Sequence, residues 1–204
     1  MGMNETTKDL RRERGKVSRQ SLIEAMILAV ARHGLPGATL SAVADIAGVS
    51  RSLINFHFQQ KEQLLDEALR YGLAAYESEL RLALAAAGTS AMDKLKCHTR
   101  HDIDFVMRHP ELLALWYAVW GDSNAMVRYR ATTLSHDRGY REEYLGYFKG
   151  LAQDEKRIAH AAFILDAYID GLWLECHLAP GELSAADAYA ATDILIDALL
   201  LKLR

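Results

Sequence analysis

The stretch TLSAVADIAGVSRSLINFHFQQKEQLL, residues 39–65, decides the fold of this chain. Its apolar residues recur every three or four positions, which predicts helices. Thr39 and Ser50 each precede such a run, where a side-chain hydroxyl can accept from the unpaired amides of a first helical turn. Gly48 lies between the runs and tolerates the positive φ that ends a helix. The stretch therefore predicts two short helices joined by a tight turn.

This arrangement is typical of a helix-turn-helix, which we expect over residues 39–61. Two helices that cross closely require a small residue at the crossing, and Ala44 meets that demand. Further apolar residues wedge the pair together: Val43, Ala47, Val49, Ile54 and Phe58. The N-terminal residues of the second helix are the ones that reach base edges in such a motif, so Arg51 and Ser52 are candidate DNA contacts.

The rest of the chain also predicts helices only, with Pro36, Pro110 and Pro180 at apparent helix boundaries. We expect an all-α fold of about nine helices. Their predicted ranges are 18–33, 40–47, 51–58, 61–87, 90–108, 110–121, 123–151, 154–178 and 184–203.

Charge and length suggest a small head and a larger body. Residues 1–62 hold nine basic and six acidic side chains, a net charge of +3. Because the whole chain has a net charge of −3, residues 63–204 carry −6. This polarity suits a head that meets phosphates. We expect a flexible basic arm over 1–17, a DNA-binding domain over 18–62 and a ligand-binding, dimer-forming domain over 63–204. The basic residues Arg11, Arg12 and Arg14 of the arm can enter a minor groove.

Several other classes of protein are disfavoured. No apolar run approaches the roughly 20 residues of a membrane span, and the N-terminus has no apolar signal core, so we expect a cytoplasmic protein. We expect no cofactor, metal or catalytic residue, because phosphate loops, nucleophile elbows and HExxH motifs are missing. A metal-dependent helical enzyme is the alternative, with candidate ligands Cys97, His98, His101 and Asp102. A scaffold protein would leave the helix-turn-helix unexplained.

Residues 18–68 resemble the N-terminal region of the tetracycline-repressor (TetR) family of bacterial regulators. The matching positions are Thr39, Ala44, Ala47-Gly48-Val49-Ser50 and Phe58-Gln59-Gln60-Lys61-Glu62-Gln63-Leu64. The resemblance implies a homodimeric repressor that reads two half-sites of a pseudo-palindromic operator and pairs through its last two helices. With the helix-turn-helix geometry, it implies DNA contacts from Thr39, Ser50, Arg51, Ser52, Asn55, Phe56, His57 and Lys61.

The chain departs from that family at Asn55, where a tyrosine is usual, and at Phe56 and His57. Asn55 can instead bond a phosphate or read an adenine edge, while Phe56 or His57 can pack against thymine methyl groups or the backbone. The alternative for His57 is packing within the head.

Aromatic residues and carboxylates gather in two segments of the body, PELLALWYAVWGDS and FILDAYIDGLWLECHL, which contain all three tryptophans. Aromatic faces near a carboxylate bind quaternary ammonium ions by cation–π attraction. The candidate walls are Trp116, Tyr117, Trp120, Tyr168, Trp173 and Phe105, and the candidate charges are Asp102, Asp166 and Asp170. Ordinary core packing is the alternative for the same aromatic residues.

The two segments also resemble the BetI-type subgroup, the repressors of choline-to-glycine-betaine genes. That resemblance implies choline or a related quaternary amine as the small-molecule inducer. A TetR-type regulator that senses another compound is the alternative.

Overall fold

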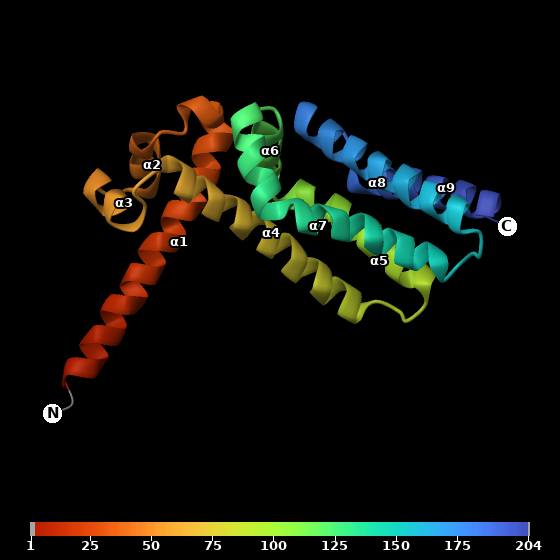
Figure 1. Ribbon diagram of the computed structural model, residues 1–204, viewed down its shortest axis with the longest axis horizontal. Coiled ribbons are helices and arrows are strands. Elements are labelled where there is room, and N and C mark those ends of the chain that lie inside the picture. Colours follow the sequence, from red (N-terminus) through yellow and green to blue (C-terminus); the bar gives the residue numbers. More distant parts are fainter. Residues whose placement is uncertain (1–2, 204) are drawn as a thin grey trace. The chain divides into compact units, whose positions relative to one another are not determined.

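The computed structural model describes the backbone of residues 3–203 and the side chains of residues 19–131 and 141–203. Over the described backbone every regular element is a helix, so the predicted all-α fold is confirmed. In chain order (Figure 1) the helices are α1 (Met3–Gly37), α2 (Leu40–Ala47), α3 (Arg51–His57), α4 (Lys61–Ala86), α5 (Ala91–Arg108), α6 (Pro110–Trp120), α7 (Ser123–Lys149), α8 (Glu155–Leu178) and α9 (Ala185–Leu203).

Helix α1 differs most from its predicted range, because it begins at Met3 rather than near residue 18. Apolar periodicity starts at Leu22, so the pattern gave no sign of the preceding turns. The helical path breaks at Gly34, where φ is 66° and ψ 175°, close to the predicted end. The side chains of Arg11, Arg12 and Arg14 lie outside the described residues, and the flexibility of the predicted arm stays a prediction.

The chain forms two compact units, Met1–Gly72 with Ala114–Tyr129, and Leu73–Leu113 with Arg130–Arg204. The first unit therefore contains the head together with most of α6 and the start of α7. Asp66 of α4 pairs there with Arg128 of α7, whose Nε lies 3.1 Å from Oδ1. The predicted DNA-binding domain, residues 18–62, lies within this first unit, and its boundary at residue 62 stays a prediction.

The second unit buries a core shared by α5, α7, α8 and α9, whose members include Leu95, Tyr144, Phe148, Leu165 and Ile196. Helices α8 and α9 lie side by side and run in opposite directions (Figure 1), joined by the turn around Pro180. No described helix is long and apolar enough to span a bilayer.

Candidate nucleic-acid interface and ligand site

Helices α2 and α3 form the predicted helix-turn-helix, and both predicted caps are present. The Thr39 hydroxyl accepts from the Ala42 amide at 3.2 Å, and the Ser50 hydroxyl accepts from the Leu53 amide at 3.4 Å. Gly48 ends α2 with φ 66° and ψ 33°, in the left-handed region that favours glycine. The turn between the helices thus follows directly from the residues that predicted it.

Buried apolar side chains hold α2 against α3. Val43 and Ile54 are completely buried, and Ala44 and Phe58 are nearly so, whereas Ala47 is half-buried. The small Ala44 side chain allows the close approach that a larger residue would prevent. These contacts fix the direction in which α3 presents its outer side chains.

The outer face of α3 carries the predicted reading residues. Arg51, Ser52, Asn55 and Phe56 are all exposed, and their spacing of four residues places them on neighbouring turns. Phe56 is 81% exposed, and its ring and that of His57 form a T-shaped pair with centroids 5.1 Å apart. An exposed cation, hydroxyl, amide and aromatic ring on one helix face form a surface that can enter a major groove.

Other contacts secure the base of the head. The guanidinium of Arg19 lies 5.1 Å from the ring centroid of Phe58 and pairs with Glu67 at 3.1 Å. Lys61, at the start of α4, donates to the Leu35 carbonyl. The phosphate contact of Lys61 that the family resemblance implied stays a prediction.

The structure separates the predicted ligand residues into two sets. Trp116, Tyr117 and Trp120 belong to the first unit, where the ring of Trp120 lies edge-on to those of Tyr117 and Tyr129 at centroid distances of 5.2 and 6.0 Å. Trp116 is buried, and the indole nitrogen of Trp120 has no hydrogen-bond partner among the described residues. The remaining candidates belong to the second unit.

In the second unit, Asp102 is a buried carboxylate at the centre of an aromatic cluster. Its Oδ1 accepts from the Tyr76 hydroxyl and its Oδ2 from the Tyr144 hydroxyl. The Trp173 indole donates to the backbone carbonyl of Asp102 at 3.1 Å. Two histidines and a phenylalanine complete the set, which we call the Asp102 cluster: Tyr76, His98, His101, Asp102, Phe105, Tyr144 and Trp173.

Ring contacts tie the members of this cluster together. Tyr76 meets Phe105 edge-on at a centroid distance of 5.2 Å and Trp173 at 6.1 Å. His98 stacks at a tilt on Tyr144 with centroids 4.8 Å apart. The members come from α4, α5, α7 and α8, so one buried carboxylate links four helices.

The electrostatics of the cluster favour an ionised Asp102. Burial by itself raises the pKa of the Asp102 carboxyl, but the neighbouring His98, the nearby His101 ring and the hydrogen bonds from Tyr144 and Tyr76 lower it below its usual value. Burial and the Asp102 charge raise the pKa of Tyr144 well above its usual value, so its hydroxyl keeps the proton it donates.

The His98 ring lies between the Tyr76 hydroxyl and the Glu143 carboxylate. The single hydroxyl proton of Tyr76 goes to Asp102, so the 3.2 Å contact between Tyr76 Oη and His98 Nε2 requires the imidazole to donate. The other ring nitrogen, Nδ1, lies 3.3 Å from a carboxylate oxygen of Glu143. His98 thus connects the buried Tyr76 hydroxyl with the exposed carboxylate of Glu143.

The other predicted charges lie elsewhere in the second unit. Asp166 pairs with Arg141 at 2.7 Å, and Asp170 is exposed on α8. Tyr168 packs on the core with its hydroxyl buried and without a hydrogen-bond partner among the described residues. Of the predicted carboxylates, Asp102 is thus the one that the structure places among aromatic rings.

The residues proposed for the alternative metal site do not assemble. Among residues 19–131 and 141–203, no group of three or more histidine, cysteine, aspartate or glutamate side chains could hold a metal ion. Asp102 is engaged by the tyrosine hydroxyls, and burial raises the pKa of the Cys97 thiol. The i,i+4 spacing of Cys97 and His101 on α5 is therefore not extended by further ligands.

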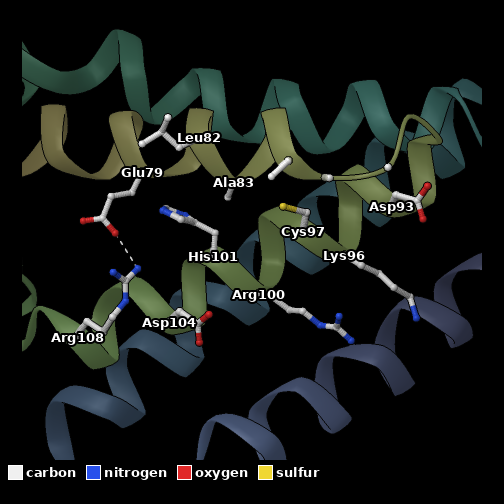
Figure 2. Close-up of a pocket in the computed structure, with 13 residues that line it drawn as sticks. Glu79, Leu82, Ala83, Asp93, Lys96, Cys97, Arg100, His101, Asp104 and Arg108 are labelled. Atoms are coloured by element: carbon white, nitrogen blue, oxygen red, sulfur yellow. Dashed lines mark ion pairs between the residues drawn. The ribbon is translucent and has the colours of Figure 1, made fainter.

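A groove of about 750 Å³ runs between the C-terminal half of α4 and α5 (Figure 2). The α4 side is mostly small and apolar, with Leu82, Ala83 and Ala86. The α5 side carries Cys97 and His101, which point toward α4 in Figure 2. Glu79 and Arg108 form an ion pair of 2.7 Å at one end.

Sequence reasoning missed Tyr76, His98, His101 and Tyr144 as ligand-site candidates. Tyr76 and Tyr144 lie 26 and 42 residues from Asp102 along the chain, and no motif connects them. The i,i+4 spacing of His98 and Asp102 did attract attention, but as a metal site. One sign was available in the sequence. His98, Asp102 and Phe105 follow one another at spacings of four and three residues, so they share one helix face.

This head and all-helical body define a DNA-binding transcriptional regulator. The profile of TetR-family bacterial regulatory proteins matches residues 22–68, and that of the C-terminal region of BetI-type transcriptional repressors matches residues 93–201. The chain therefore belongs to the TetR family and carries a BetI-type C-terminal domain, as the sequence predicted.

Relatives support this assignment over almost the whole chain. The HTH-type transcriptional regulator BetI of Serratia proteamaculans is 30% identical over 178 residues, which cover 86% of this chain and 89% of that protein. BetI of Burkholderia ambifaria is 28% identical over 187 residues, covering 91% and 95%.

Solved structures share the fold. A transcriptional regulator from Pseudomonas aeruginosa PAO1 has a TM-score of 0.73 and 28% identity, covering 91% of this chain and 93% of that one. A regulator from Saccharomonospora viridis, solved in complex with choline, has a TM-score of 0.70 and 19% identity, covering 89% and 96%. At that identity the second likeness concerns the fold alone.

Proposed function

We propose that this repressor binds a pseudo-palindromic operator as a homodimer and is released by a small quaternary amine, choline or a close relative. The observation that carries the ligand class is the buried, ionised Asp102 surrounded by Tyr76, Phe105 and Trp173. A quaternary ammonium donates no hydrogen bond. It is instead held by the faces of aromatic rings and by the negative charge of a nearby carboxylate. Operator binding also requires the predicted cytoplasmic location.

For DNA, we assign base reading to the exposed face of α3 and anchoring to the residues around it. Arg51 and Asn55 have the donors that read guanine and adenine edges, and the exposed ring of Phe56 can meet a thymine methyl group. Thr39, Ser50, Ser52, His57 and Lys61 are assigned to phosphates, which position the head without reading sequence. The exposed Thr39 lies at the start of α2, beside the first amides of that helix.

For the dimer, we assign the outer faces of α8 and α9. Apolar residues exposed there include Phe163, Ile164, Leu174, Leu178, Ile194 and Leu201. Exposed apolar residues at helical spacing on two adjacent helices require a partner, and a second copy supplies the same two helices in a two-fold arrangement. Ile158 of α8 and Leu199 of α9 do not belong to these faces, because they are buried in the subunit's own core.

For induction, we assign the coupling to α4, because this helix contributes to both units. Lys61 begins it within the head, and Tyr76 brings its later turns to Asp102. A ligand shifts the equilibrium between DNA-binding and released states only by its differential affinity for them. A cation that competes for Asp102 changes the contact with Tyr76 and thereby favours another position of α4.

The experiment is a gel shift or footprint on DNA upstream of the protein's own gene, with and without choline, betaine aldehyde and glycine betaine. Retardation that choline relieves supports the whole proposal, and retardation indifferent to all three compounds removes the inducer class while retaining the repressor. Failure to retard DNA at low salt contradicts operator binding. Asp102→Asn should weaken the response to choline without changing operator affinity.

The head has its own test. Lys61→Ala should weaken binding to all DNA sequences alike and flatten the salt dependence, whereas Arg51→Ala should change sequence preference. A preference left unchanged by Arg51→Ala would contradict the reading role of that residue.

A further inference from the structure

Two neighbouring carboxylates of α4 bond to different helices. Asp66 accepts from two nitrogens of the Arg128 guanidinium on α7: Nε lies 3.1 Å from Oδ1, and Nη2 donates to Oδ2. Glu67 pairs with Arg19 of α1 at 3.1 Å. Consecutive residues of a helix point in different directions, so α4 is bonded on one side to the head and on another to α7.

The start of α7, which carries Arg128, is firmly placed within the first unit. The Asp122 carboxylate accepts from the Ala125 amide at 2.8 Å and so stabilises the first turn of the helix. Ala125 and Tyr129 are buried, and the ring of Tyr129 meets that of Trp120 of α6 edge-on at a centroid distance of 6.0 Å. Arg128 therefore reaches α4 from a fixed support.

The chain passes between the two compact units within three helices, α4, α6 and α7. Inside the first unit, the Asp66–Arg128 pair joins α4 to α7, and the ring contact of Trp120 with Tyr129 joins α6 to α7. A single helical connection can act as a hinge, whereas connections that are bonded to one another cannot move independently. A partly exposed ion pair adds little stability by itself, so the importance of this pair lies in the helices that it joins.

We propose that Asp66 and Arg128 are positioning residues for operator binding, because their pair restricts the movement of α4 and so aligns the two heads of the dimer with both half-sites. This inference rests on the proposed function, in which a homodimer binds a pseudo-palindromic operator. Two linked heads bind a full site more tightly than a half-site because the second contact is intramolecular, and this gain falls when the heads are held less precisely. Neither residue belongs to the reading helix α3, so loss of the pair leaves the contacts of a single head with DNA unchanged.

The test compares the affinity of the full chain for two DNA duplexes. One duplex is the segment protected in the footprint, and the other is the same segment with one half-site replaced by an unrelated sequence. The ratio of the two affinities is the gain, which is about 10²–10⁴ for two well-placed linked sites. Arg128→Gln and Asp66→Asn should each lower the gain about three- to tenfold, the range for a partly exposed charge-assisted bond, and leave the half-site affinity unchanged.

A double-mutant cycle and a matched control assign the effect to the pair. The variant with both Asp66→Asn and Arg128→Gln should lose no more of the gain than either single variant, because both changes remove the same bond. Arg128→Lys keeps the charge but not the planar fork of donors, so it should retain part of the gain. Arg70→Gln is the control, because the pair of Arg70 with Glu67, at 2.8 Å, joins residues of α4 alone and its loss should leave the gain unchanged.

A gain that survives both Arg128→Gln and Asp66→Asn overturns this inference alone. Equal losses of full-site and half-site affinity also overturn it, because they indicate a damaged head rather than a misplaced one. Additive losses in the double variant, or the same loss in Arg70→Gln, overturn it as well, since the bond between Asp66 and Arg128 is then not the cause. A wild-type chain without any gain contradicts operator binding as a dimer, together with this inference.

Discussion

Replacing Tyr144 with phenylalanine tests the account of the Asp102 cluster. The hydroxyl of Tyr144 donates to Asp102 Oδ2, and both residues are 2% exposed. Oδ1 has the Tyr76 hydroxyl and, at 3.7 Å, His98 Nε2, whereas Tyr144 is the donor that the structure gives to Oδ2. Tyr144→Phe changes no ring contact, so it removes one hydrogen bond to a buried charge and leaves the packing in place.

We expect this variant to unfold with a free energy about 2 kcal/mol lower than that of the wild type. Hydrogen bonds to charged groups contribute roughly 1.5–3 kcal/mol, and a buried acceptor left without a donor cannot recover the loss from water. In an Asp102→Asn background the same change should cost less than about 1 kcal/mol, because the acceptor is then neutral. The coupling between the two substitutions is the quantity predicted.

The measurement is urea unfolding at one fixed protomer concentration, since the stability of the proposed dimer would depend on concentration. The pKa of Asp102 is lower in the folded state than its ordinary value of 3.8, so its contribution is complete above that value and is lost as the pH falls through the folded-state pKa. The cost of Tyr144→Phe should accordingly be constant near neutral pH and shrink below about pH 4.

Two results would refute the reasoning. If Tyr144→Phe lowered the free energy of unfolding equally in the wild type and in the Asp102→Asn variant, the hydroxyl would not act through the carboxylate charge. A cost that grows toward acid pH would mean that the protonated carboxyl, and not the ionised one, is the form that Tyr144 stabilises in the folded protein.

Three further predictions concern the turn, the dimer and the reading face. Gly48→Ala should lower stability by about 1 kcal/mol, because φ is +66° there; the added Cβ meets no other atom, so the backbone conformation is the cause. Gly146→Ala, at an exposed position within α7, should instead raise stability in the same unfolding assay. Ile194→Glu should shift sedimentation toward a monomer, whereas Leu82→Glu, at a similarly exposed apolar site, should not. Phe56→Ala should change the free energy of unfolding by less than about 0.5 kcal/mol yet weaken operator binding in a gel shift, and unchanged binding would contradict its role.

The head could be predicted closely because its determinants are local. Thr39 and Ser50 cap the helices that directly follow them, and Gly48 adopts the conformation that its missing Cβ allows. Each of these effects involves residues at most a few positions apart, so spacing in the sequence reports them directly. The ranges of α2 and α3 consequently agree with the prediction to within one residue.

The body was predictable as a set of helices but not as a site. The tryptophans attracted attention as a possible cage, yet Trp116 and Trp120 lie in one unit and Trp173 in the other. Aromatic residues at helical spacing indicate that a face is buried and do not indicate which partner buries it. Periodicity fixes the face of each helix, and only packing between helices assigns a side chain to a particular carboxylate.

Asp102 illustrates what determines such a site. A carboxylate buried to 2% exposure is unstable alone, so its presence requires compensating groups, here two phenols and an imidazole from three helices. Because two tyrosine hydroxyls already bond to Asp102, the proposed cationic ligand would have to compete with them for the carboxylate. In the proposed mechanism, the affinity of the ligand depends on how firmly α4, α5 and α7 hold Asp102, and this dependence couples ligand binding to the position of α4.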